Sequence, residues 1–116
     1  TCFSAVQMAE QTNARAIVTF SHSGYTAFQI SSHRPKADIF AFTMNRSLLP
    51  MLSMVWGVRA FYLKSEDNIE NYINRSIEFL KEKKHIRDGD VIVHVGSIPL
   101  LEKGKTNMLK ISCVET

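Results

Sequence analysis

Two polar segments of this 116-residue sequence carry the side chains best suited to chemistry. The first runs from residue 19 to residue 26, and its candidate site residues are Ser21, His22, Ser23, Gly24, Tyr25 and Thr26. Hydroxyl groups, a glycine that lets backbone approach a ligand closely, and the N–H groups of a helix start together favour binding of an anion. A plain helix start capped by Ser21 or Ser23 explains the same residue types equally well. Spacing alone leaves both interpretations open.

The second polar segment runs from residue 96 to residue 107 and contains Lys103, Gly104 and Lys105. Its ending is similar to the end of a Walker A loop, but the earlier glycine of that motif would fall at Pro99. The segment also leads into a predicted strand, whereas a Walker A loop leads into a helix. We therefore predict no P-loop. The segment can still lie over a ligand held by the first one, because both follow strands that we expect to be neighbours.

No other group of residues predicts a catalytic or metal centre. The four histidines lack metal-ligand spacing and no cysteine accompanies them, so we expect no zinc site. Ser23 precedes a glycine but lacks the G-x-S-x-G context of a nucleophile elbow. Asp88 and Asp90 flank Gly89, a pattern typical of a turn. We predict no catalytic residue, metal ligand or cofactor site in this sequence.

Apolar periodicity predicts the elements that position the two segments. We expect helices from near residue 3 to Asn13 and over 25–33, 46–54 and 68–84, with Ser4 and Asn45 as caps of the first and third. Continuous apolar runs predict buried strands at 16–20, 38–43, 58–63 and 91–95. A last strand, 108–114, alternates apolar and polar residues, as exposed antiparallel strands do. The fold class is α/β: a three-layer α/β/α sandwich with a mostly parallel five-stranded sheet, the last strand antiparallel at or near an edge.

Length and composition narrow the classes of protein. With 45% hydrophobic and 22% charged residues the chain is not disordered, and no apolar run approaches the ~20 residues of a membrane span. We expect a single α/β domain over residues 1–116. The first residue is Thr1, not Met, and we expect the sequence to be a fragment of a longer chain.

The charge of the chain bears on its binding partners, and its cysteine content bears on its cellular location. A net charge of +3 is too small to indicate nucleic acid. Residues 1–64 carry six Lys/Arg against two acids, which suits an anionic small molecule, although solvated surface side chains explain the same count. Two cysteines near opposite ends, without C-x-x-C spacing, favour reduced thiols and a cytoplasmic location.

Several short motifs resemble, in order, the C-terminal α/β domain of pyruvate kinase. They occupy residues 16–27, 30–35, 39–43, 56–58, 88–93 and 104–111. Each is weak alone, but their collinear order over almost the whole chain is specific. The resemblance implies an intact enzyme that transfers a phosphoryl group between phosphoenolpyruvate and ADP in glycolysis. It also implies magnesium and potassium as cofactors of that enzyme, a cytoplasmic tetramer, and catalytic residues in a preceding barrel domain.

The resemblance further implies what this domain does. In the family it makes subunit contacts and, in many members, binds an allosteric sugar phosphate at the turn matching Ser21 to Thr26, with the loop around Lys103 to Lys105 closing over it. Ile98 stands where some members have a basic residue, and Tyr72 near where others have an arginine. These departures favour a monophosphate, with Lys103 or Lys105 as a point charge.

The implied partners are the chain's own barrel domain, other subunits of a homo-oligomer and a sugar-phosphate effector, with no nucleic acid and no membrane. The subunit contact is expected at the edge strand 108–114 or at an apolar surface near Met51, Met54 and Trp56. The alternative is a stand-alone binding or assembly module of the same fold without a catalytic barrel.

Overall fold

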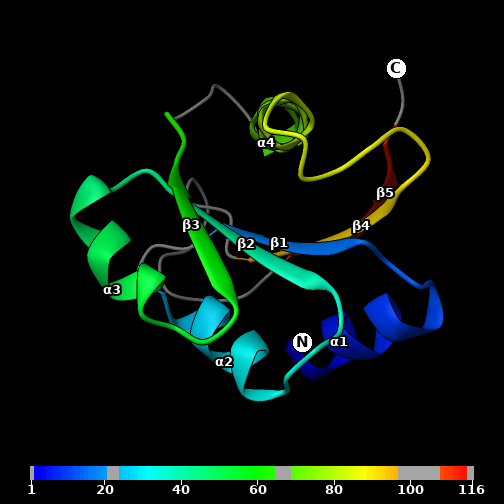
Figure 1. Ribbon diagram of the computed structural model, residues 1–116, viewed down its shortest axis with the longest axis horizontal. Coiled ribbons are helices and arrows are strands. Elements are labelled where there is room, and N and C mark those ends of the chain that lie inside the picture. Colours follow the sequence, from blue (N-terminus) through cyan, green and yellow to red (C-terminus); the bar gives the residue numbers. More distant parts are fainter. Residues whose placement is uncertain (1, 21–23, 65–68, 97–107, 115–116) are drawn as a thin grey trace.

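The structure is a computed structural model that describes residues 2–20, 24–64, 69–96 and 108–114 (Figure 1). Within them, five strands form one sheet in the order β3-β2-β1-β4-β5. Strands β1 to β4 are parallel and β5 is antiparallel to β4 at the edge, which confirms the predicted fold class. The elements are α1 (Cys2–Gln11), β1 (Ala16–Phe20), α2 (Tyr25–Ser32), β2 (Asp38–Thr43), the 3-10 helix η1 (Arg46–Leu48), α3 (Leu49–Ser53), β3 (Val58–Tyr62), α4 (Ile69–Glu82), β4 (Val91–Gly96) and β5 (Met108–Cys113).

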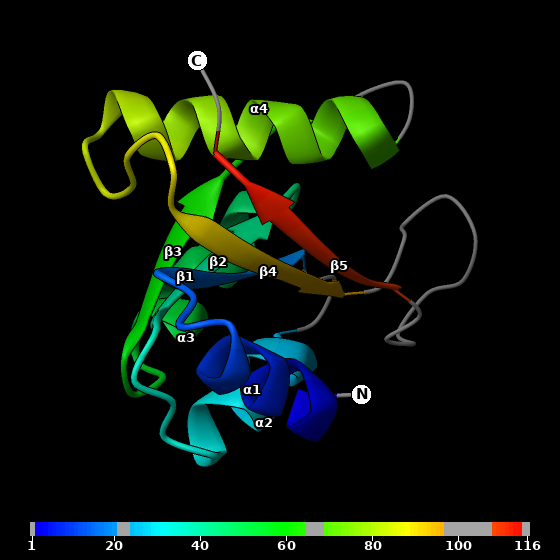
Figure 2. The same ribbon diagram turned by 90° about the vertical axis from the view of Figure 1, so that its right-hand side faces the viewer.

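Helices cover both faces of the sheet, as Figure 2 shows. Helices α1, α2 and α3 lie on one face, over a core that includes Ile17 and Ile39. Helix α4 lies on the other, over a core that includes Val18 and Phe40. Because successive strand residues point to opposite faces, the fully buried runs of β1 and β2 supply both cores. Continuous apolar strands are therefore the sequence signature of these covered positions.

The chain reverses its direction across the sheet after β3. From β1 to β3 it moves one way, with α2 and α3 on one face, and α4 then crosses the opposite face to place β4 beside β1. Since β–α–β crossovers are right-handed, a reversal of direction puts the crossing helix on the other face. The carboxyl ends of β1 and β4 therefore form the topological switch point, where open α/β sheets bind ligands.

Aromatic side chains hold α4 on the sheet. The ring of Phe79 meets Phe42 edge-on at a centroid distance of 5.8 Å and lies 5.0 Å from Phe61. The hydroxyl of Tyr72 donates a hydrogen bond to the carbonyl of Leu63, just beyond β3, at 3.2 Å. The helix is thus fixed by aromatic packing and by this hydrogen bond near its start.

Tyr72 predicts an alkaline limit to stability. Burial, with a smaller contribution from Tyr62, raises the pKa of Tyr72 above the ordinary tyrosine value of about 10. Above that value the unfolded chain loses a proton that the folded chain keeps, so the free energy of unfolding falls as pH rises. We expect Tyr72→Phe to reduce this slope in urea unfolding above pH 10. At pH 7 it should cost about 0.5–1.5 kcal/mol through the lost hydrogen bond. Equal alkaline slopes in both proteins would contradict the assignment.

Helix boundaries show where local sequence rules were sufficient and where they were wrong. Ser4 is not the cap of the first helix, because α1 already includes Cys2. Asn45 does cap the third segment, its Oδ1 accepting from the Ser47 N–H at 3.0 Å. That segment starts as a 3-10 helix, since Pro50 has no N–H for the Arg46 carbonyl and the Leu49 N–H bonds to it instead.

Candidate functional site

The two polar segments leave neighbouring strands at the same edge of the sheet. Strands β1 and β4 pair in parallel, and their last paired residues are Phe20 and Gly96. The first segment continues from Phe20 and the second from Gly96. The expectation that both follow neighbouring strands is confirmed. We call the space at the carboxyl ends of these two strands the switch-point crevice.

Three of the predicted site residues lie within the described part of the chain, at the start of α2. Gly24 is the N-cap, with φ +86° and ψ −4°, and its carbonyl accepts from the Phe28 N–H at 3.0 Å. Gly24 therefore occupies the N-cap position, and the alternative in which Ser21 or Ser23 caps the helix concerns residues outside the described part of the chain. Ser21, His22, Ser23, Lys103, Gly104 and Lys105 lie outside the described residues.

Gly24 has two independent reasons to be glycine. Its positive φ is a conformation that other L-residues rarely adopt. In addition, a Cβ at this position would lie 2.6 Å from Cε of Met51 and 3.1 Å from Cδ2 of Leu52. The start of α2 therefore packs directly against α3. This contact determines where the helix begins relative to the switch-point crevice.

The side chains that follow Gly24 point in different directions. Tyr25 is 60% exposed, whereas Thr26 is buried. The side chain of Thr26 therefore packs into the interior at the start of α2, whereas that of Tyr25 lies at the surface. The positive end of the α2 dipole lies at this point, at the carboxyl edge of the sheet.

Thr19 is a further polar residue near the crevice that was not among the predicted site residues. It is fully buried on β1, in register with Ala41 and Val95, both of which belong to the core beneath α1, α2 and α3. Among the described residues its Oγ1 has no hydrogen-bond partner. A buried hydroxyl left in that state costs about 1–3 kcal/mol. The sequence signal was a hydroxyl within an otherwise apolar strand, one residue before the strand ends.

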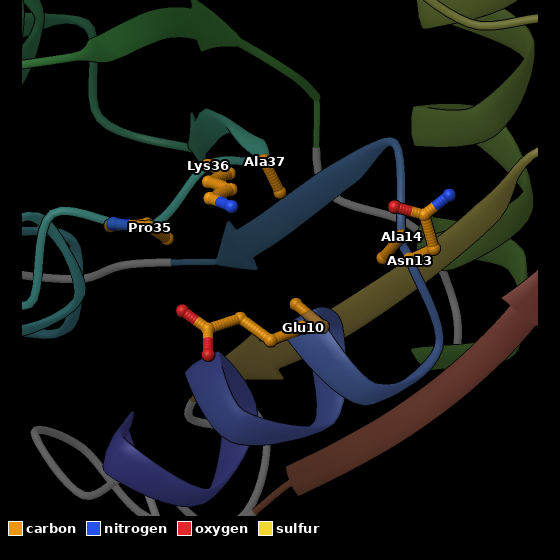
Figure 3. Close-up of a pocket in the computed structure, with 7 residues that line it drawn as sticks. Glu10, Asn13, Ala14, Pro35, Lys36 and Ala37 are labelled. Carbon is orange, nitrogen blue, oxygen red and sulfur yellow. The ribbon is translucent and has the colours of Figure 1, made fainter.

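Other hollows are also bordered by described residues. In Figure 3, Glu10 of α1 and Lys36 before β2 border a hollow of about 210 Å³, next to Asn13. Another, of about 370 Å³, is bordered by basic residues that include Arg15 and Arg87. Both lie where the chain enters the strands, at the edge of the sheet opposite the crevice. A third, between α2 and α3, is bordered mainly by apolar side chains, among them Phe28, Met51 and Trp56.

The described residues contain neither a metal-ligand set nor a membrane-spanning helix. Across residues 2–20, 24–64, 69–96 and 108–114, no three His, Cys, Asp or Glu side chains come together as a ligand set. Within the same ranges no helix has the length and apolar content needed to cross a membrane.

Comparisons with known proteins agree with this architecture. The family model for the pyruvate kinase alpha/beta domain matches residues 1–112. Pyruvate kinase of Lactobacillus delbrueckii subsp. bulgaricus is 32% identical over 96% of this chain and 19% of its own length. That of Staphylococcus aureus (strain USA300) is 35% identical over 88% of this chain and 17% of its own.

Solved structures give the same result. Cryptosporidium parvum pyruvate kinase in complex with ADP is 31% identical, with a TM-score of 0.85 over 97% of this chain and 22% of that one. The chain thus spans about a fifth of the length of the relatives it matches. The expected resemblance is confirmed, and the chain belongs to the pyruvate kinase family, in which it corresponds to the alpha/beta domain.

Proposed function

We propose that this chain is the C-terminal α/β domain of a pyruvate kinase and is not itself catalytic. In the intact enzyme, a barrel domain would transfer a phosphoryl group between phosphoenolpyruvate and ADP, with magnesium and potassium, in the cytoplasm. The observation that carries the proposal is the match of the family model over residues 1–112, together with matches to pyruvate kinases about five times as long as this chain. The described residues offer no metal-ligand set, so we assign none of them to either ion.

For the domain itself, we propose binding of the phosphate of a sugar phosphate in the switch-point crevice. The N-terminal end of α2 supplies a positive dipole there, and Gly24 holds the helix start close to α3. Ser21, His22, Ser23 and Thr26 would provide further donors, with Lys103 and Lys105 as charges from the second segment.

A single phosphate fits these residues better than two. The position on α4 at which some family members are expected to have an arginine is near Tyr72, which is buried. Its hydroxyl already donates to the Leu63 carbonyl, so it has no charge and no spare proton to offer a second phosphate. We therefore propose a monophosphate as the effector.

Titration calorimetry tests this site with inorganic phosphate, a sugar monophosphate and a sugar bisphosphate. We expect the monophosphate to bind, and Ser23→Asp to weaken its affinity about tenfold or more, because the added carboxylate repels the anion. Ser32→Asp is the matched control, since it adds the same charge to the exposed far end of α2. Equal weakening by both variants, or no binding at millimolar concentration, would refute the effector site.

The enzyme assignment is tested separately, on the reading frame that encodes the chain. We expect several hundred upstream codons with the repeated strand–helix pattern of a barrel, and a purified full-length product that forms pyruvate from phosphoenolpyruvate and ADP. A start codon directly before Thr1 would instead favour a stand-alone module.

We also propose a part for this domain in subunit assembly. Strand β5 is at the sheet edge, and its Ile111 is 44% exposed. Cys113, two residues further on, is exposed as well. An edge strand with an apolar side chain at its surface can pair with the same strand of a second subunit.

A further inference from the structure

We propose that a basic hollow at the amino ends of β1 and β4 is a second anion site, which binds a phosphate dianion. The residues that border it are Arg15, Lys84, His85, Arg87 and Asp90, around a volume of about 370 Å³. This basic hollow is separate from the proposed effector site, because the switch-point crevice lies at the carboxyl ends of the same two strands.

Two segments far apart in the sequence build the basic hollow. Arg15 immediately precedes β1, and the other bordering residues lie in the connection from α4 to β4. Strands β1 and β4 are parallel neighbours, and the Arg15 N–H donates to the Val91 carbonyl at 2.8 Å. Figure 2 shows both segments at the same edge of the sheet. The sheet itself therefore holds the two sides of the hollow together.

Backbone hydrogen bonds fix the shape of the connection from α4 to β4. The His85 N–H donates to the Leu80 carbonyl at 2.9 Å, and Lys84 between helix and turn adopts φ +65°. A lysine thus places an ammonium group at a position whose backbone conformation favours glycine. Further on, Oδ2 of Asp90 accepts from the Arg87 N–H at 2.8 Å. The connection is ordered without any ligand.

His85 supplies a neutral hydrogen-bond donor that is already oriented. Nη1 of Arg59 lies 3.3 Å from Nδ1 of His85. Because a guanidinium can only donate, Nδ1 must accept, and the ring proton is on Nε2. The imidazole also lies 5.1 Å from the ring of Phe40 and 5.9 Å from that of Phe61. Its orientation is therefore set by three neighbours, and Nε2–H is left to donate to a ligand.

The positive charge of the basic hollow is not neutralised within the described part of the chain. There, Lys84 and Arg87 are exposed and form no ion pair. Arg15 lies 3.9 Å from Asp38, which is too long for a hydrogen bond. Asp90 is the one acid among the bordering residues, and its carboxylate already accepts from the backbone. Three cations against one carboxylate leave a formal excess of two positive charges.

A phosphate dianion matches both the charge and the donors of the basic hollow. It carries a charge of about −1.5 to −2 at pH 7. Two guanidinium groups can each donate a pair of hydrogen bonds to its oxygens, and Lys84 adds a point charge. Asp88, next to Arg87 in the sequence, does not offset this charge, because it pairs with Lys81 at 2.7 Å.

Acetylation of lysine side chains in the full-length protein, read residue by residue by mass spectrometry, tests the proposal. Inorganic phosphate replaces chloride at constant ionic strength. We expect saturating phosphate to slow acetylation of Lys84 about tenfold, because a bound anion covers the amine and holds its proton. Lys83 is the matched control, since it is exposed, lies 5.7 Å from the ring of Phe79 and does not border the hollow. Its acetylation should not change.

Charge-removing variants locate the bound anion. Arg87→Gln should raise the phosphate concentration for half-protection of Lys84 about tenfold, through the loss of charge-assisted hydrogen bonds. Arg46→Gln removes the same charge from an exposed position after β2, at the opposite edge of the sheet, and should leave that concentration unchanged. Ser23→Asp, which is directed at the proposed effector site, should leave it unchanged as well.

Three outcomes would overturn the proposal. They are equal protection of Lys84 and Lys83, equal effects of Arg87→Gln and Arg46→Gln, and loss of the protection in Ser23→Asp. The last would place the anion in the switch-point crevice. A parallel titration with a phosphate monoester identifies the source of the dianion: protection at the same concentration supports an organic phosphate, and protection by inorganic phosphate alone supports the free ion.

Discussion

Gly24→Val is expected to lower the free energy of unfolding of the chain by about 3–4 kcal/mol. A β-branched residue at φ +86° pays for an unfavourable backbone conformation, about 1–2 kcal/mol. It also places methyl groups against Leu52, which is fully buried and cannot move aside, and overpacking of this kind costs about 1–3 kcal/mol. Urea unfolding monitored by circular dichroism measures the sum.

Comparison with Gly57→Val separates the cost of the backbone conformation from the cost of overpacking in Gly24→Val. Gly57 has φ +70°, but nothing lies within 4 Å of the Cβ it would acquire. We expect that variant to lose only the conformational part, about 1–2 kcal/mol. Gly24→Ala should fall between the two, because the flexible end of half-exposed Met51 can turn toward solvent. Equal losses for Gly24→Val and Gly57→Val would show that the contact between α2 and α3 does not constrain residue 24.

The Gly24→Val substitution also links the stability of the fold to the proposed effector site. Gly24 is the N-cap of α2 and sets the distance of that helix start from α3. We expect a larger residue at position 24 to displace the start of α2 from α3 and thereby to change the geometry of the switch-point crevice. The glycine was predicted as a point of close backbone approach to a ligand, and the structure adds a close approach to α3.

The strands could be read from the sequence because burial on both faces leaves a local mark. Residues 16–20 and 38–43 are continuous apolar runs, and the structure has strands at the same positions. The end of α1 near Asn13 could also be predicted from the local sequence, because asparagine tolerates the positive φ of 54° found there. The end of α4 was likewise predicted to within two residues, since the expected end was residue 84 and the helix ends at Glu82. Lys84 adopts φ +65° while the His85 N–H bonds to the Leu80 carbonyl, a helix ending that glycine would usually mark.

The candidate site was predictable in outline and not in detail. Neighbouring β1 and β4 follow from the fold class, so the meeting of the two polar segments could be expected from topology. The packing of Gly24 against Met51 joins residues 27 positions apart in the sequence, and no local pattern contains it. The burial of Thr19 without a partner among the described residues likewise depends on which face of β1 it occupies and what covers that face.

Phe20→Ala is expected to be the most destabilising substitution, at about 3–5 kcal/mol, the usual cost of removing a buried aromatic ring. Phe20 is 2% exposed and is the last residue of the central strand. Its ring meets Tyr72 of α4 edge-on at 4.9 Å, lies 6.3 Å from Phe42, and is parallel to His94 at 6.1 Å. It therefore joins β1, β2, β4 and α4 directly beneath the switch-point crevice.

Two control variants make this expectation specific. Phe28→Ala makes the same chemical change at a 55% exposed position and should alter the stability of this chain by no more than about 0.5 kcal/mol. Phe20→Leu keeps most of the volume and should cost about 1 kcal/mol. A loss from Phe20→Ala close to that from Phe28→Ala would contradict the central position of the ring. Because Phe20 immediately precedes Ser21, the first candidate site residue, a folded Phe20→Leu protein should also bind the monophosphate more weakly, which would connect the aromatic core to the proposed effector site.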